Sequence, residues 1–323
     1  MRPFAFMRAE DLNNAKIAAT DGGAVIAGGT TLVDLMQLNV MRPSGVIDIN
    51  KLGMNTILDA TDTVSIGALV TNTTLAQNEL IMREFPVLSQ AILSGASPQL
   101  RNKATVGGNL LQRTRCAYFR DPAFNCNKRK PGSGCPALDG HNRTHAVLGC
   151  SDHCIATHPS DMAVALVMLD TTVVISGAKG ERRVPIGEFH LLPGSTPQTE
   201  TVLEPGEIIT AIEIKKSDAA RKSCYLKVRD RASFSFAITS AAIAYKTELG
   251  VITEARIGLG GVATKPWRAT EAEEFLKGKS ATKDNFRAAA EKALANAQPR
   301  KHNKYKVELA KRTMVRALEQ LGA

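Results

Sequence analysis

Residues 24–40, AVIAGGTTLVDLMQLNV, decide how the N-terminal part of this chain folds. The apolar run Ala24–Ala27 predicts a buried strand, and the apolar spacing over Leu32–Val40 predicts a helix. The turn Gly28-Gly29-Thr30 connects them. Backbone N–H groups at a helix start lack partners within the helix, so this turn can bind an anion, and its glycines let a phosphate approach. A glycine pair is also common in a plain tight turn, and G-x-G-x-x-G is absent, so no Rossmann site is predicted.

A second glycine turn, Thr105-Val106-Gly107-Gly108-Asn109, follows helices expected over Thr73–Asn78 and Pro86–Ser94. Its threonine and asparagine side chains can hydrogen-bond phosphate or ribose oxygens. Two such turns in one α/β region are about equally consistent with a dinucleotide bound between them and with two structural turns that bind nothing. Further along, Ser160 and Asp161 precede a helix over 162–169. They are either its N-cap or a hydroxyl and a carboxylate available to a ribose or an adenine.

The length of 323 residues exceeds what one hydrophobic core usually supports, so two or three domains are expected. A small α/β unit covers about residues 1–55. A larger unit over about 56–217 contains a hairpin at 172–185. Beyond residue 217, strands within 225–259 are followed by helices within 271–321, which is the order of an α+β domain.

Five of the six cysteines lie within 39 residues, inside a stretch from about 112 to 156 where regular apolar spacing fades. A loop of this length within a compact domain is usually functional or disordered. The spacing is C-x9-C-x8-C-x14-C-x3-C. An iron-sulfur cluster needs four thiolates and tolerates varied spacing, whereas structural zinc favours close pairs, and only Cys150 and Cys154 come near that. From spacing alone, a cluster, zinc and plain structural thiols all remain open.

The formal net charge of +10 is concentrated near these cysteines, because residues 101–143 hold nine basic and two acidic side chains. A nucleic-acid-binding surface would place such charge on a recognition helix or among stacking aromatic residues. Here the basic residues overlap the cysteines and can offset the negative charge of several thiolates. We therefore expect no nucleic-acid partner.

The sequence predicts neither a membrane span nor an export signal. No run of 18 apolar residues is present, and the first ten residues lack the apolar core of a signal peptide. The expected location is the cytoplasm, or the periplasm if the chain is exported folded with a partner that bears a signal.

Four segments together resemble the FAD-binding medium subunits of the molybdenum hydroxylases, the xanthine dehydrogenase family, over essentially the whole chain. They are Ile26–Leu32, the stretch 101–109 with its second glycine turn, Pro159–Asp161 and Lys227–Arg231. The likeness is strongest to the flavin and [4Fe-4S] subunits of bacterial aldehyde oxidoreductases. It implies an α+β fold with a two-part vanillyl-alcohol-oxidase-type (PCMH) FAD-binding domain over 1–217. A small α+β domain, like the C-terminal domain of carbon monoxide dehydrogenase flavoproteins, would cover 218–323.

The resemblance also implies which residues contact FAD. Ile26–Leu32 would wrap the pyrophosphate, Asp161 would hold the adenosine end, and Lys227 with Ile209 would approach the isoalloxazine ring, where a cation stabilises reduced flavin. Without the resemblance, Lys227 reads as an exposed strand residue. The expected contacts are Val25, Ile26, Ala27, Gly28, Gly29, Thr30, Thr31, Leu32, Thr105, Gly108, Asn109, Leu111, Gln112, Ser160, Asp161, Ile209 and Lys227.

The cysteine insertion resembles one that binds [4Fe-4S] in certain aldehyde oxidoreductase and 4-hydroxybenzoyl-CoA reductase flavin subunits. The implied ligands are Cys116, Cys126, Cys135 and Cys154. Cys150 lies close enough in sequence to substitute for Cys154. The sixth cysteine, Cys224, starts an apolar strand and is expected to be a small core residue.

The implied function is that of an FAD- and [4Fe-4S]-containing electron-transfer subunit of a molybdenum-dependent aldehyde oxidoreductase, with no catalytic residue of its own. A molybdenum-cofactor large subunit would oxidise the substrate, and a [2Fe-2S] small subunit would pass single electrons to this chain. FAD would then reduce an external acceptor. Two alternatives stay open: a flavin subunit of a 4-hydroxybenzoyl-CoA reductase-like enzyme with inward electron flow, and a zinc-stapled basic binding module.

Overall fold

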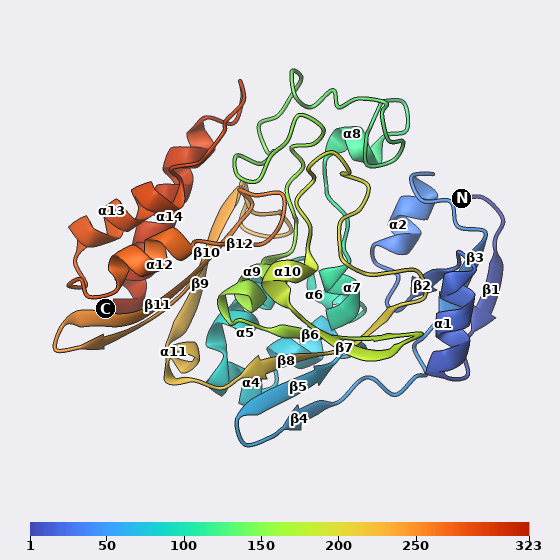
Figure 1. Cartoon of the computed structure of the whole chain (residues 1–323), viewed down its shortest axis with the longest axis horizontal. Coiled ribbons are helices and arrows are strands. Elements are labelled where there is room, and N and C mark those ends of the chain that lie inside the picture. The colour runs from blue at the N-terminus through green and yellow to red at the C-terminus, as the bar shows by residue number, and fades with distance from the viewer. Residues whose placement is uncertain (323) are drawn as a thin grey trace.

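The structure of the protein is a computed structural model that describes residues 1–322 and contains three β-sheets (Figure 1). The N-terminal sheet is parallel, with strand order β1-β3-β2. Its strands are β1 (Ala5–Arg8), β2 (Ala24–Ile26) and β3 (Gly45–Asp48), and its helices are α1 (Leu12–Thr20) and α2 (Leu32–Gln37). The predicted strand, glycine turn and helix are therefore confirmed as β2, the turn and α2.

Helix α2 ends earlier than the sequence predicts. We expected it to continue to Val40, but Gln37 is its last residue, and Asn39 adopts a left-handed φ of 55°. The Val40 amide donates back to the Leu35 carbonyl at 2.9 Å. Asparagine tolerates this conformation better than most residues, and the helix stops there despite the apolar spacing beyond it.

The second sheet has five strands in the order β4-β5-β8-β6-β7, and every neighbouring pair is antiparallel. The strands are β4 (Ile57–Asp59), β5 (Thr63–Gly67), β6 (Thr172–Gly177), β7 (Gly180–Pro185) and β8 (Ile208–Lys215). The helices of this unit are α3 (Asn72–Ala76), α4 (Glu79–Glu84), α5 (Pro86–Ser94), α6 (Pro98–Arg101), α7 (Val106–Leu110), α9 (Asp161–Met168) and α10 (Ile186–Phe189). The predicted hairpin at 172–185 is confirmed as β6 and β7.

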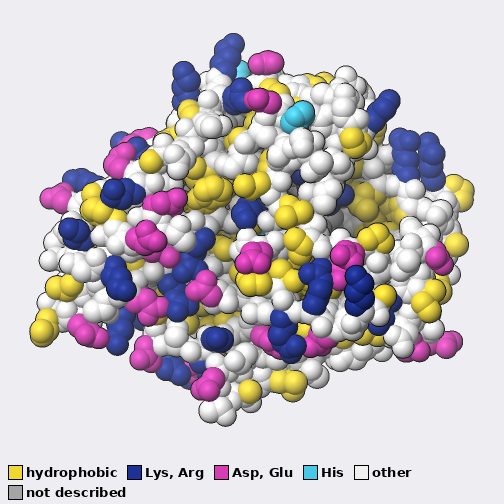
Figure 2. All heavy atoms as spheres, viewed as in Figure 1, with side chains coloured by type: hydrophobic (Ala, Val, Ile, Leu, Met, Phe, Trp, Pro, Cys, Tyr) yellow, Lys and Arg dark blue, Asp and Glu magenta, His cyan; other side chains and the backbone are white. Residues whose placement is uncertain are grey.

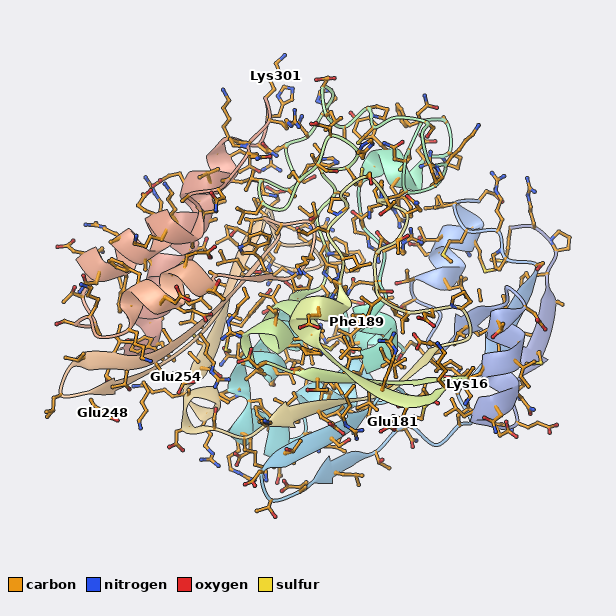
Figure 3. All side chains as sticks on the ribbon, viewed as in Figure 1. Lys16, Glu181, Phe189, Glu248, Glu254 and Lys301 are labelled. Carbon is orange, nitrogen blue, oxygen red and sulfur yellow. The ribbon has the colours of Figure 1, made fainter. Side chains whose placement is uncertain are left out.

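Helix α9 forms the centre of the main hydrophobic core, and all eight of its residues are buried. The Ser160 side chain caps it by accepting the Ala163 amide at 2.9 Å. Phe189, labelled near the middle of the molecule in Figure 3, belongs to the same core and is 0% exposed. The core therefore starts directly behind Ser160 and Asp161 and fixes their backbone.

The third sheet and its helices follow the predicted order of strands and then helices. The sheet is antiparallel, with order β12-β11-β10-β9. Its elements are α11 (Asp218–Arg221), β9 (Ser223–Val228), β10 (Thr239–Glu248), β11 (Val251–Gly260), β12 (Trp267–Arg268), α12 (Thr270–Leu276), α13 (Lys283–Ala293) and α14 (Tyr305–Gly322). Figure 1 shows α12, α13 and α14 together on one side of this sheet. Cys224 is half-buried against the core of this part, close to its predicted role.

The cysteine-rich stretch forms the top of the molecule in Figure 1 and has one short helix, α8 (Ala117–Arg120). It is held to the C-terminal part by backbone contacts. Leu148 forms a parallel bridge with Ala263, and the Gln298 amide donates to the Val147 carbonyl at 2.6 Å. Irregular backbone in this stretch thus finds some of its hydrogen-bond partners in another part of the chain.

Lys306, at the start of α14, adds three side-chain hydrogen bonds to these connections. Its side chain is 0% exposed, and its Nζ donates to the carbonyls of Thr144, His145 and Gly261. Burial lowers the pKa of Lys306 to about 7. No helix within residues 1–322 has the length and apolar character needed to cross a membrane.

We expect Lys306→Met to destabilise the protein by about 2–4 kcal/mol, because three carbonyls lose their buried donor while the apolar stem is kept. Unfolding in urea, followed by far-UV circular dichroism, measures the change. Lys301→Met is the matched control, since Lys301 is exposed and points away from the molecule in Figure 3. Equal midpoints for the two variants would contradict a structural role for Lys306.

Candidate cofactor-binding site

Both predicted glycine turns line one cavity of about 290 Å³. The first turn lines it together with the preceding strand, through residues 24–32. The second turn lines it through Thr105, Gly107 and Gly108. Leu111 and Ile209 are among the other residues of its wall. The two turns, which are far apart in the sequence, therefore form a single site.

The packing of Gly28 explains why this position requires glycine. A Cβ atom there would lie 1.7 Å from the Lys103 carbonyl oxygen, which is backbone and cannot swing aside. Gly29 has a φ of +72°, a conformation that favours glycine. The first turn is thus pressed against the chain just before the second.

The second turn is not a plain turn, as the sequence suggested, but the helix α7. The Thr105 hydroxyl accepts the Gly108 amide at 3.2 Å as the N-cap. A Cβ on Gly107 would lie 3.1 Å from the Ala68 side chain, so this glycine lets α7 pack closely on the preceding sheet. The tight packing outweighs the low helix propensity of two glycines.

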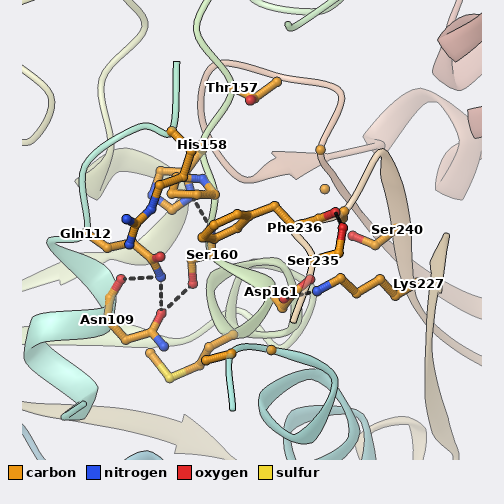
Figure 4. A pocket seen from close by; sticks show the side chains of 18 of the residues that line it. Asn109, Gln112, Thr157, His158, Ser160, Asp161, Lys227, Ser235, Phe236 and Ser240 are labelled. Carbon is orange, nitrogen blue, oxygen red and sulfur yellow. Dashed lines mark hydrogen bonds and ion pairs between the residues drawn. The ribbon is translucent and has the colours of Figure 1, made fainter. Parts of the chain in front are cut away.

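A larger cavity of about 880 Å³ adjoins the first, and Thr30, Thr31 and Gly108 line both. Figure 4 shows its polar wall. Asn109 Oδ1 accepts from Ser160 Oγ at 2.6 Å and from Gln112 Nε2 at 2.7 Å. These bonds fix three of the predicted contact residues relative to one another.

A buried ion pair lies at the other side of the large cavity. Lys227 Nζ is 2.7 Å from Asp161 Oδ2, and their side chains are only 3% and 8% exposed. The Tyr225 hydroxyl donates to Asp161 Oδ1 at 2.6 Å, and Lys227 also donates to the Ser94 carbonyl at 3.0 Å. Burial, together with the charge of Asp161, raises the pKa of Tyr225 well above its usual range. Lys227 is therefore not the exposed strand residue that the sequence alone suggested.

This contact contradicts the roles that the resemblance implied. Asp161 was expected at the adenosine end and Lys227 with Ile209 at the isoalloxazine ring, but Asp161 and Lys227 touch, whereas Ile209 lines the smaller cavity. Because the two ends of an FAD molecule are far apart, the separate ends that the resemblance implied for Asp161 and Lys227 do not fit one bound FAD.

The structure brings all seventeen predicted FAD contacts to these two cavities. The smaller one is lined by Val25, Ile26, Ala27, Gly28, Gly29, Thr30, Thr31, Leu32, Thr105, Gly108, Leu111 and Ile209. The larger one adds Asn109, Gln112, Ser160, Asp161 and Lys227. The larger cavity is also lined by Phe236, which the sequence analysis did not identify as a site residue and which lies just before β10.

The four predicted cluster cysteines line one small cavity, formed by Cys116, Cys126, Cys135 and Cys154. The Ala156 amide donates to Cys154 Sγ at 3.4 Å, and further backbone amides bond to Cys116 and Cys135. Burial raises the pKa of the free Cys116 thiol to about 12. Within residues 1–322, no three Cys, His, Asp or Glu side chains are arranged to hold a single metal ion.

Cys150 lies outside this cavity. Its Sγ donates to the Ala146 carbonyl at 3.3 Å, and burial raises its pKa to about 11. Between the two candidates for the fourth position, the structure brings Cys154 to the other three thiols.

Most basic residues near the cysteines have acidic partners. Arg115 and Arg120 both pair with Asp34, and Lys128 pairs with Glu200. On the face shown in Figure 2, basic and acidic side chains are interspersed and form no continuous basic patch. More than half of the basic side chains of this stretch thus form ion pairs with acidic side chains of the same chain.

Two models of known families cover the chain. Residues 2–216 match the FAD-binding domain in molybdopterin dehydrogenase, and residues 224–321 match the CO dehydrogenase flavoprotein C-terminal domain. This chain belongs to the FAD-binding subunits of the molybdopterin dehydrogenases. It is therefore one subunit of a molybdenum-hydroxylase-family oxidoreductase, as the sequence resemblance implied.

Relatives within this family match the chain over its whole length. The aldehyde oxidoreductase FAD-binding subunit PaoB of Escherichia coli is 46% identical, over 100% of this chain and 99% of that protein. The glyceraldehyde dehydrogenase medium chain of Sulfolobus acidocaldarius is 27% identical, over 99% and 98%. The carbon monoxide dehydrogenase structure from Hydrogenophaga pseudoflava superposes with a TM-score of 0.77 at 25% identity, over 99% and 98%. The predicted fold is confirmed.

We expect Gly28→Ala to lower the affinity for FAD at least tenfold, because overpacking against the Lys103 carbonyl costs about 1–3 kcal/mol or more. Flavin absorbance per purified chain, before and after dialysis, measures the loss. Gly187→Ala is the control, since no atom lies within 4 Å of a Cβ at that position. Full flavin retention in Gly28→Ala would show that the turn tolerates a side chain.

The buried pair His158 and His190, whose ring centroids lie 4.5 Å apart beside the site, gives a pH dependence. Burial lowers the pKa of His190 to about 4, below the value near 6.5 of an unfolded chain. Its stabilising contribution is therefore complete above pH 6.5 and is lost as the pH falls toward 4. From pH 7 to pH 5, we expect the wild type to lose about 2 kcal/mol more unfolding free energy than His190→Gln. Urea unfolding at both pH values measures this difference, and equal losses would argue against a neutral buried imidazole.

Proposed function

We propose that this chain is the FAD- and [4Fe-4S]-containing electron-transfer subunit of a molybdenum-dependent aldehyde oxidoreductase. The observation that carries the proposal is the position of Cys116, which lines both the four-cysteine cavity and the large cavity. An electron could thus pass between a cluster and a flavin across one side chain. The aldehyde substrate class is supported by the full-length 46% identity to an aldehyde oxidoreductase subunit.

The cavities support one orientation of FAD. The smaller cavity is mainly apolar and suits the adenosine end, with Val25, Leu32 and Ile209 in its wall. The pyrophosphate would lie at Thr30, Thr31 and Gly108, which border both cavities. The isoalloxazine ring would then occupy the large cavity, beside Lys227 and Cys116. FAD supplies the conversion between single-electron and two-electron transfer.

Buried Asp161 sets the electrostatics at the ring. It accepts hydrogen bonds from both Lys227 and Tyr225, so the charge of the lysine is already balanced before a flavin binds. Lys227 also donates to the Ser94 carbonyl. The lysine is thereby held in place, and negative charge that develops nearby meets a fixed ion pair with its N–H donors rather than mobile water.

The donor set around the cysteine cavity fits an iron-sulfur cluster. Four thiols surround one space, and backbone N–H groups donate to the sulfurs of Cys116, Cys135 and Cys154. Such bonds favour the thiolates that iron requires and also tune a cluster's potential. The full-length family match leaves no support for the alternative of a zinc-stapled basic module.

The proposed partners are a molybdenum-cofactor large subunit and a [2Fe-2S] small subunit, followed by an external electron acceptor. The sequence has no plant-type C-x4-C-x2-C spacing, so the [2Fe-2S] cluster would belong to another chain. The compartment, cytoplasm or periplasm, would be set by the partner that carries an export signal.

Cysteine variants of the complex, purified without air, test the cluster. We expect Cys154→Ser to lower the iron content by about four atoms per chain and Cys150→Ser to leave it unchanged, because only Cys154 reaches the cavity. Iron, zinc and flavin are counted per chain, and the reduced complex is examined by electron paramagnetic resonance.

Cys224→Ser, in the C-terminal core, is a further control. Loss of iron in Cys150→Ser instead would reverse the ligand assignment. A wild type with flavin but no iron beyond that of its partner would leave an FAD subunit without a cluster, and zinc in place of iron would likewise overturn the proposal.

A further inference from the structure

His145 lies at the boundary between the large cavity and the cysteine cavity. Its Nε2 is 3.1 Å from Cys116 Sγ, and its ring lines the large cavity. Of the four cavity cysteines, only Cys116 also borders the large cavity. The histidine therefore contacts the one thiol that faces both proposed cofactors.

The position of His145 is fixed from several sides. The residue is 5% exposed, and its amide donates to the Asn142 carbonyl at 3.0 Å. Its own carbonyl accepts from Lys306 Nζ at 2.9 Å and from Asn303 Nδ2 at 3.3 Å. Helix α14 and Asn303, two residues before its start, thus anchor the histidine backbone, and the ring has little freedom to leave Cys116.

The direction of the hydrogen bond follows from the chemistry of a thiolate. A cysteine that binds iron has no hydrogen on sulfur and can only accept, so the proton must be on Nε2 of His145. Nδ1 is buried and has no partner among the described residues, so no second bond competes for that tautomer. Backbone amides donate to Cys116, Cys135 and Cys154, whereas His145 donates from a side chain.

We propose that His145 is a positioning residue for electron transfer, whose Nε2–H donates to the Cys116 sulfur, orients that ligand toward the flavin cavity and raises the reduction potential of the cluster. The proposal rests on the function proposed above. A reduced cluster carries more negative charge on its sulfurs, so a donor stabilises it more than the oxidised form. Each transfer moves one electron across this contact, reducing one cofactor and oxidising the other, while His145 keeps its proton.

Redox titration of the whole complex, followed by electron paramagnetic resonance, tests the proposal. We expect His145→Leu to keep its flavin and iron. The equilibrium constant for one electron shared between cluster and flavin should shift at least tenfold toward the flavin, because one hydrogen bond to a charged group is lost. His145→Gln, which keeps an N–H donor, should stay within about threefold of the wild type. His141→Gln is the matched control, since His141 is an exposed histidine of the same stretch.

A measurement on the wild type alone covers the case in which His145→Leu loses its cluster. With histidine nitrogen isotopically labelled, electron-nuclear double resonance of the reduced cluster should detect one coupled histidine N–H whose proton exchanges in heavy water. A cluster present in the wild type without this coupling, or an unchanged potential in an intact His145→Leu, would overturn the inference. A wild type with no such cluster would instead overturn the proposed function.

Discussion

The contact between Gly28 and the Lys103 carbonyl is the constraint on which the rest of the site depends. It presses the turn of the N-terminal parallel sheet against the backbone just before α7, at a distance that no Cβ permits. Because of this contact, threonines of the first turn and Gly108 of the second border both cavities. A looser junction would separate the small cavity from the large one, and a molecule as long as a dinucleotide would lose its continuous path.

The ion pair of Asp161 and Lys227 makes a second junction, between the start of α9 and strand β9 of the third sheet. Burying two charges is costly, and the cost is offset here by close geometry and by the additional bonds from Tyr225 and to Ser94. Removing either partner would leave an uncompensated charge in the core. The wall of the large cavity therefore depends on both parts of the chain being folded together.

The sequence predicted the local helices and strands well, but it predicted poorly the contacts between residues far apart in the chain. Strand β2, the hairpin of β6 and β7, and the order of strands and helices after residue 217 follow from apolar spacing, which acts over a few residues. Helix α7 was missed because two glycines disfavour a helix until Ala68 packs against them. The family resemblance supplied the site residues, but the contact of Asp161 with Lys227 joins positions 66 residues apart, and no local pattern reports it.

The attachment of the cysteine-rich stretch to α14 has a consequence for how the protein matures. Asn303 and Lys306 supply donors to carbonyls near His145, yet they are synthesised long after the cysteines leave the ribosome. Since chains fold from the N-terminus as they emerge, these carbonyls stay without their donors until the last helix forms. Metal delivered before α14 docks would meet a cysteine-rich stretch not yet tied to the last helix, and docking would then fix the backbone around His145.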